Sequence, residues 1–486
     1  MSSRANSQKR TIELEMTDTT LSKAADDSGK QTNWKMIIVA GIISALNAVE
    51  NSAIGLGEWP YLKELDPTVD AQFFGFATSA SKCAHAIFTL VFATWSFRIR
   101  SIKIPLLVGR FLAIIACFLY MCIEYVPHER RYVSLIVYVM LGIANSSTTV
   151  LRAYVTYLST KEDRARAFAC IGLSTICSIA VGPILQLCFS GITYPGFQIV
   201  HGVYFHIYSA PIWCSFMLTI FTLFIIQRLM QDVARNEENE NECLLSIEEV
   251  KKSIRKLREI NIDWKLIFVC LVVKIANSFS HATMQSIMSI FFMVQYGWTG
   301  EETVKASSVI MVAFGAVSCT VFLLYIFCNI GNCLPQRYTF LVGIVLSGLV
   351  FVLTYPFEFV SSPVVLYNET LRSGCNPAEY SWCETAYAVN PYWFLAVSVV
   401  VMSPTLPLLH VSLDTLYSKI LGNIDQNVAQ GAISVVDDIV FMVTPIFTTT
   451  VFVYFGVGTL WLAKTAVYTF MAILWTVNLH KIKHYE

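Results

Sequence analysis

Charged residues are scarce in this chain. Asp, Glu, Lys and Arg make up 14% of the 486 residues, whereas a soluble domain carries about 25%. Hydrophobic residues reach 55% and the mean hydropathy is +0.57, which is more apolar surface than one water-facing core could bury. The formal net charge is zero, so nothing favours a nucleic-acid partner. Lipid is therefore the predicted solvent for most of the chain.

Several chemical signatures are also missing. The sequence has no CxxC pair and no Cys/His spacing typical of a metal site, so no metal ion and no cofactor is predicted. It shows no Ser/His/Asp arrangement and no phosphate-binding loop, which argues against an enzyme. Residues 1–35 lack the apolar stretch of a cleaved signal peptide and are expected to form a disordered cytosolic tail.

The apolar residues form long runs. A helix needs about 20 such residues to cross about 30 Å of hydrocarbon. Twelve stretches qualify as membrane spans, at 36–57, 71–95, 104–124, 132–156, 166–190, 207–229, 264–293, 303–328, 338–356, 391–412, 428–453 and 458–479. We therefore predict an all-α membrane protein with an N-terminal six-helix bundle (36–229) and a C-terminal one (264–480), joined by a cytosolic amphipathic linker (230–263).

Basic residues in the loops indicate the orientation. The short loops predicted to be cytosolic hold Arg98, Arg100, Lys103, Lys161, Arg164 and Arg166. The positive-inside rule then places both termini in the cytosol and loop 357–390 in the lumen. That loop contains a glycosylation sequon at Asn368. It also contains Cys375 and Cys383, which we expect to form a disulfide in an oxidising lumen; two free thiols are the alternative.

A sorting signal is a further hypothesis. "ENECLL" (240–245) fits the acidic dileucine pattern through Leu244 and Leu245, which would recruit sorting adaptors. A match of six residues also arises by chance, and that alternative stays open.

Polar residues recur on single faces of several spans. In span seven, Lys274, Asn277 and His281 follow helical spacing, with Lys274 about 15 Å into the membrane. Asn47 and Glu50 mark span one, and Arg152 marks span four. Ionisable side chains at such depth usually face a cavity, so these six residues are the predicted substrate or ion cavity. The alternative is hydrogen bonding between helices. Span ten has a sparser stripe, Ser403, His410 and Asp414.

Two adjacent acids interrupt span eleven. Asp437 and Asp438 lie about ten residues into it, at the depth of Lys82 and His85 in span two. A charge at the bilayer centre costs at least about 2.5–3.5 kcal/mol on insertion scales. We therefore predict that Lys82 pairs with one of the two acids between the halves and that the other acid serves proton coupling.

Twelve spans in a six-plus-six arrangement resemble the major facilitator superfamily. The segment "TKEDRARAFACIGLSTICSIAVGPILQ" (160–186) is similar to the loop before its fifth helix and to that helix itself, where Gly182 and Pro183 match and small residues permit close helix approach. The resemblance implies two halves that rock about a central cavity, with helix 2 beside helix 11. The acidic loop motif after span two of that superfamily is degraded here to "ATWSFRIRSIKIP".

Other segments resemble a lysosomal branch of this superfamily, the neuronal ceroid lipofuscinosis type 7 family. They include "WPYLKELDPTVDAQFFGF" (59–76), "VLRAYVTYLS" (150–159) and "TLYSKILG" (415–422). The resemblance implies a glycosylated protein of the endolysosomal membrane. The chain departs from the branch at Asp437 and Asp438, where the branch has small residues, and at Phe441, where it has an arginine.

Three interpretations of function stay open. The first is a transporter of a small solute or ion, with proton coupling. The second is an anion channel for chloride, in which Lys82, Arg152 and Lys274 supply a positive field. The third is a membrane scaffold without transport activity, which mid-membrane charges argue against. In each case membrane lipid is a partner and a monomer is expected.

Overall fold

The computed structural model describes most of the chain, at residues 32–160, 163–200, 202–232, 264–327, 335–368, 372–421 and 426–485. Nearly all of the predicted tail, most of the predicted linker and the Leu244/Leu245 pair lie outside these ranges. Within them, ten helices are long and apolar enough to cross a membrane.

The N-terminal half contains the first six spans. They fall on α2 (Trp34–Ile54), α4 (Ala71–Arg98), α5 (Lys103–Met121), α6 with η2 and α7 (Arg130–Ser146, Ser147–Thr149 and Val150–Leu158), α8 (Arg164–Cys188) and α9 (Ala210–Leu229). Short elements connect them: α3 (Glu58–Leu65), η1 (Ile123–Tyr125) and the antiparallel hairpin of β1 (Phe197–Val200) and β2 (Val203–Phe205), in which Phe197 pairs with Phe205. Inside this half, α2 packs against α8 and α9.

The C-terminal half contains the other six. They fall on α11 (Trp264–Tyr296), α12 (Gly300–Phe327), α14 (Gln336–Leu353), α15 with η3 and α16 (Pro391–Val397, Ser398–Met402 and Ser403–Leu421), and α17 with η4 (Gln426–Ile482 and Lys483–Tyr485). A two-residue pairing of β3 (Ser362–Pro363) with β4 (Tyr387–Ala388) lies in the long loop before α15. The predicted all-α fold is confirmed, and its twelve spans correspond to the ten long apolar helices when α17 is counted as two and α8 is added.

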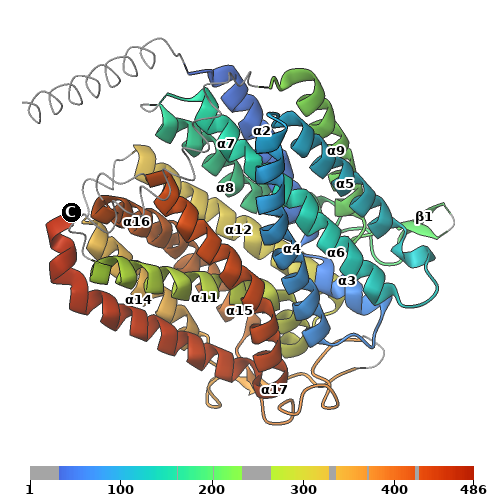
Figure 1. Ribbon diagram of the computed structural model, residues 1–486. Helices are drawn as coiled ribbons and strands as arrows, with labels where there is room; N and C mark the ends of the chain where they lie inside the picture. The colour runs from blue at the N-terminus through green and yellow to red at the C-terminus, as the bar shows by residue number, and fades with distance from the viewer. Residues whose placement is uncertain are drawn as a thin grey trace, which may run out of the picture.

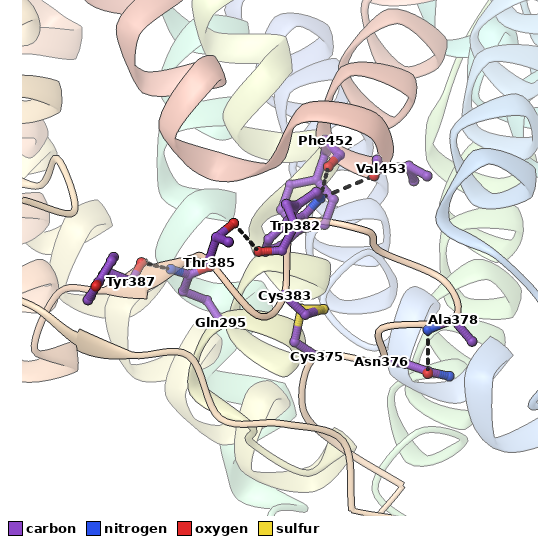
Figure 2. The surroundings of a disulfide bond; sticks show 10 residues. All are labelled: Gln295, Cys375, Asn376, Ala378, Trp382, Cys383, Thr385, Tyr387, Phe452 and Val453. Atoms are coloured by element: carbon purple, nitrogen blue, oxygen red, sulfur yellow. Dashed lines mark hydrogen bonds between the residues drawn. A yellow bond between two sulfur atoms is a disulfide. The ribbon is translucent and has the colours of Figure 1, made fainter. Parts of the chain in front are cut away.

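The long helix α17 is two spans joined at a sharp kink. Gly456 has φ +75° there, a left-handed conformation that glycine adopts without steric cost. Phe452 and Val453 lie in the last turn before the kink, and backbone carbonyls at the end of a helix need partners from outside the helix. The indole Nε1 of Trp382 donates to both carbonyls, at 3.0 and 3.1 Å. A side chain from the long loop therefore completes the hydrogen bonding of this kink (Figure 2).

The same loop carries a disulfide. Cys375 and Cys383 are joined, with their Cα atoms 5.7 Å apart, which is the pair expected from the sequence. Figure 2 shows this bond beside Trp382. Gln295 of α11 donates to the carbonyl of Tyr387 at the other end of the loop. Asn368, the predicted glycosylation site, is exposed in the same loop.

Small residues let two helices of the N-terminal half approach closely. A methyl group added at Gly182 of α8 would lie 2.5 Å from the Ser52 hydroxyl of α2. Pro183 follows inside the same helix. The sequence-based expectation that this Gly-Pro pair permits close packing therefore has a specific partner, α2.

The two halves lie side by side (Figure 1) and meet along two helix pairs. α4 packs against α17, and α8 packs against α12. The start of α2 and the end of the chain lie on one side of the molecule, while α3, β1 and the long loop lie on the other (Figure 1). We call the side with α3 and the long loop the distal face.

The helix α3 is fixed to the distal face by a buried polar contact. Tyr61 donates to Glu124 Oε1 at 3.1 Å, and His206 Nε2 lies 3.0 Å from the same oxygen. The backbone N–H groups of Tyr208 and Ser209 point at His206 Nδ1, so that nitrogen accepts and Nε2 donates. The start of α3 is thus held in a defined position.

An ion pair inside the N-terminal half accounts for Glu50. Arg110 of α5 donates to Glu50 Oε2 at 2.9 Å, and the side chains are 0% and 6% exposed. Thr219 of α9 donates to the other carboxylate oxygen at 2.7 Å. Glu50 therefore ties three helices of one bundle together, and the prediction that it lines the cavity is corrected.

Breaking this pair should destabilise the fold. Glu50→Gln leaves the Arg110 guanidinium buried without a counter-charge, which costs about 3–5 kcal/mol. We expect a clearly lower melting temperature of the detergent-solubilised protein, measured by intrinsic fluorescence. The double variant Glu50→Gln/Arg110→Met removes both charges and should recover most of the loss. Equal melting of Glu50→Gln and wild type would contradict a structural role for the pair.

Candidate functional site

The halves are tied together at the distal face. Lys63 Nζ lies 3.1 Å from Glu379 Oε1, and Arg372 Nη1 lies 3.6 Å from Glu64 Oε2. Between described residues, these are the two ion pairs within 4.0 Å that cross from one half to the other. The backbone N–H of Tyr194 also donates to Glu301 Oε1 at 2.7 Å. The distal end of the space between the halves is therefore closed.

A charged cluster lies deeper between the halves. Lys274 of α11 is 5% exposed, and its ammonium lies 3.5 Å from Asp437 Oδ2 of α17 and 3.8 Å from Asp414 Oδ1 of α16. Asp437 is the better shielded of the two acids, with 27% of its side chain exposed against 45% for Asp414. Ser278, one turn along from Lys274, donates to Asp437 Oδ1. Because solvent screens exposed pairs, Asp437 is the principal partner of Lys274.

The second acid of α17 faces the other half. The positive charges of Lys82 on α4 and Arg152 on α7 both lie within electrostatic range of Asp438. Both cationic side chains are exposed rather than packed into their bundle. We define the charged cluster as three cations and three acids from five helices of both halves: Lys82, Arg152, Lys274, Asp414, Asp437 and Asp438.

The pairing inside the cluster differs from the prediction. Among the described residues, Lys82 forms no ion pair within 4.0 Å with Asp437 or Asp438. Asp437 pairs with Lys274 instead. The physical reason is rotation about the helix axis. Adjacent positions on a helix differ by about 100°, so Asp437 turns toward α11 in its own half and Asp438 is left near Lys82. His85 lies one turn beyond Lys82 on the same helix, within electrostatic range of it.

A small pocket adjoins the cluster inside the C-terminal half. Asn277 and His281 of α11 line it together with His410 of α16, so these three sequence-predicted residues lie together. The ring of His281 also meets Phe441 edge-on, with centroids 6.1 Å apart. The cavity prediction for Asn277 and His281 thus has a geometric basis, but the pocket belongs to one half rather than to the space between halves.

Sequence analysis missed two buried cations. Arg110 is one, and Lys464 of α17 is the other, with 3% of its surface exposed. Lys464 Nζ donates to the carbonyl of Ser280 at 2.7 Å and lies 4.6 Å from the centre of the Phe351 ring. Each is a single basic residue in the middle of an apolar run. A charge at such membrane depth is a signal of a functional or paired residue, so the sequence could have identified both.

The remaining predicted cavity residue lies within the N-terminal half. Asn47 is 8% exposed, and its Oδ1 accepts no hydrogen bond from a described residue.

Over the described ranges, His, Cys, Asp and Glu side chains do not gather in groups of three that could hold a metal ion. What the charged cluster offers instead is charge of both signs, which can contact an ion or a polar solute.

Two six-helix bundles that enclose a charged cluster define the class of helical membrane transporters. The chain belongs to the Major Facilitator Superfamily, because the sequence model of that family matches residues 36–372. It is a transporter rather than an enzyme. The family resemblance noted from its sequence is confirmed, and so is the fold.

Known relatives agree with this assignment. The chain is 23% identical over 451 residues to Major facilitator superfamily domain-containing protein 8 of Xenopus laevis, covering 88% of this chain and 87% of that protein. Among solved structures, it resembles a D-xylose-proton symporter, with a TM-score of 0.62 and 10% identity over 92% of this chain and 97% of that one. It also resembles the nucleoside transporter NupG, with a TM-score of 0.58 and 13% identity over 91% and 98%. These structures share the fold with this chain.

The pairing of Lys274 with Asp437 can be tested by stability. Lys274→Met leaves Asp437 and Asp414 without their cation, and because both carboxylates are partly exposed we expect a moderate loss of stability, about 1–2 kcal/mol, and a lower melting temperature. The double variant Lys274→Met/Asp437→Asn removes one uncompensated charge and should melt above the single variant. If Lys274→Met/Asp438→Asn recovers as much, the partner assignment is wrong.

Proposed function

We propose that this protein carries a small solute or ion across an endolysosomal membrane by alternating access, with coupling to protons. The observation that carries the proposal is the charged cluster, which draws side chains from both halves to one place between them. Mid-membrane charges are costly and are retained where they serve transport. A scaffold would gain nothing from them.

The conformation supports a carrier rather than a channel. Ion pairs between the halves close the distal face, while Lys82 and Arg152 in the cluster are exposed. A carrier opens to one side at a time as its halves rock about a fixed site. An anion channel, the second candidate, would need a path open at both ends. The mixed signs of the cluster also argue against a purely positive anion path.

Proton coupling is assigned to the acids of α17. Asp437 already has Lys274 and the Ser278 hydroxyl as partners. Asp438 has a like charge beside it along the helix, and its cations come from the opposite half. A carboxylate in this position can exchange its cation for a proton when the halves separate. We therefore assign the coupling role to Asp438.

The proposed membrane location and the orientation of the protein rest on sequence similarity and sequence motifs. The chain is 23% identical to Major facilitator superfamily domain-containing protein 8, and its own sequence motifs resemble the lysosomal branch of the superfamily, the neuronal ceroid lipofuscinosis type 7 family. We propose an endolysosomal membrane, cytosolic termini and a lumenal distal face that carries the Asn368 sequon. Leu244 and Leu245 stay a proposed adaptor signal.

Glycosylation tests the orientation. In the protein isolated from cells, we expect treatment with an N-glycosidase to increase gel mobility, because the distal face enters the lumen. Asn368→Gln should abolish that shift. The second formal sequon, Asn145, lies in a membrane helix, so Asn145→Gln is a control that should keep the shift. A shift that persists in Asn368→Gln would contradict the assignment.

Uptake into proteoliposomes tests the transport function. The solute panel covers D-xylose and nucleosides, the classes named for the structural neighbours, together with chloride. Wild type should take up at least one of them saturably, with proton movement reported by a trapped pH dye. Lys274→Met should lower that uptake about tenfold or more, because it removes a site cation. Lys265→Met, an exposed lysine at the start of the same helix, should not.

Electrical recording separates the alternatives. Large, non-saturating currents with chloride as the sole permeant anion would favour a channel and contradict the carrier. Neither uptake nor current in well-folded protein would favour the scaffold.

A further inference from the structure

Lys464 is a buried cation without an acidic partner. Its ammonium donates to the carbonyl of Ser280 at 2.7 Å and lies 4.6 Å from the centre of the Phe351 ring. Among the described residues, no carboxylate oxygen comes within 4.0 Å of it. Arg110 and Lys274, the other two buried Lys and Arg side chains, each pair with an acid. The positive charge of Lys464 therefore has no counter-charge from the described protein.

The small pocket of the C-terminal half lies beside this ammonium. Phe351, whose ring lies under the ammonium, lines the pocket. His281, the residue that follows Ser280 on α11, lines it as well. So does Tyr468, which is one helical turn beyond Lys464 on α17. The pocket and Lys464 thus share a wall that is built from α11, α14 and α17.

Three side chains with N–H donors line this pocket and form no hydrogen bond inside the described protein. They are the amide of Asn277 and the imidazole rings of His281 and His410. An amide group has two N–H donors, and a neutral imidazole has one. Polar groups this deep in a protein normally have a hydrogen-bond partner. Three of them around one pocket therefore indicate that a polar occupant belongs there.

The size of the pocket limits what that occupant can be. Its volume is about 20 Å³, and a cavity of roughly 10–15 Å³ holds one water molecule. A monatomic anion is of similar size, whereas a phosphate, a sulfate or an organic solute is larger. A water molecule would meet the hydrogen-bonding groups, but it would leave the charge of Lys464 uncompensated.

We propose that this pocket binds one monatomic anion of the halide class, for which Lys464 supplies the opposite charge. The N–H groups of Asn277, His281 and His410 donate to the anion, which connects α11 to α16. The inference goes beyond the proposed transport function and does not depend on it. The pocket lies inside one bundle rather than between the halves, so the anion is a bound partner of the fold and not a transported solute.

Two nearby acids act against an anion, and their own pairing limits that effect. Asp414 is one turn from His410 on α16. Its carboxylate lies 3.8 Å from the Lys274 ammonium, and that of Asp437 lies 3.5 Å from the same group. Lys274 offsets part of the negative charge of these acids and draws both of them away from Lys464.

An uncharged lysine is the competing explanation. An amine that is buried away from water can stay neutral, and it then needs no counter-ion. A neutral Lys464 beside a pocket that holds water predicts a protein whose stability does not depend on which anion is present. The two explanations are therefore separated by a comparison of anions.

Thermal melting of the detergent-solubilised full-length protein makes this comparison, with chloride replacing gluconate at constant ionic strength. Gluconate is too large for the pocket. We expect the melting temperature of wild type to rise saturably with chloride, by about 3 °C or more, because a ligand stabilises the state that binds it. Lys464→Met should abolish the rise. Lys265→Met, at an exposed lysine at the start of α11, is the matched control and should keep it.

A second variant and a structural probe complete the test. If Lys464→Met fails to fold, His410→Phe keeps a ring and removes one N–H donor, so it should raise the chloride concentration at half-saturation about tenfold. Crystals soaked in bromide should show an anomalous-scattering peak inside the pocket. A wild-type melting temperature indifferent to chloride, an undiminished rise in Lys464→Met, or a pocket without bromide would overturn the proposal. Failed solute uptake would count against the transport function alone.

Discussion

Lys274 requires a negative partner, because its side chain is almost fully buried among the helices and an unpaired charge at such depth is costly. Asp437 and Asp414 meet that requirement, and in doing so they draw α17 and α16 toward α11. The arrangement of the C-terminal half around the site follows from this contact. With Asp437 engaged inside its own half, the neighbouring Asp438 is directed toward Lys82 and Arg152. The site between the halves thus depends on a pair within one of them.

The fold was predictable from local information, and the pairing of charges was not. Span positions depend on the length and hydropathy of continuous runs, and even the two spans that meet at Gly456 were separated correctly. Depth along a helix also follows from counting residues, which placed Lys82, Lys274 and Asp437 at one level. The direction of a side chain around its helix depends on neighbours that a sequence does not specify. For that reason Glu50, expected in the cavity, instead meets Arg110 inside its bundle.

The long loop joins the two halves at the distal end of the molecule. At the distal face, α3, the disulfide-bonded loop and the start of α12 form polar contacts between the halves. The indole of Trp382, from the same loop, donates to the carbonyls of Phe452 and Val453 next to the kink in α17. The part of the loop that meets the N-terminal half is therefore attached to the helix that packs against α4. Separation of the halves at this face would strain both attachments together.

The net charge of the cluster determines how each step of the transport cycle responds to membrane voltage. Three cations and three acids sum to zero, so a carrier with an empty site and all six groups ionised moves no net charge as its halves rock. Each proton bound makes the moving unit carry one positive charge. A membrane potential then acts on that step by up to about 2.3 kcal/mol for every 100 mV. The return of the empty carrier would be insensitive to voltage, whereas the loaded step would be driven or opposed by it.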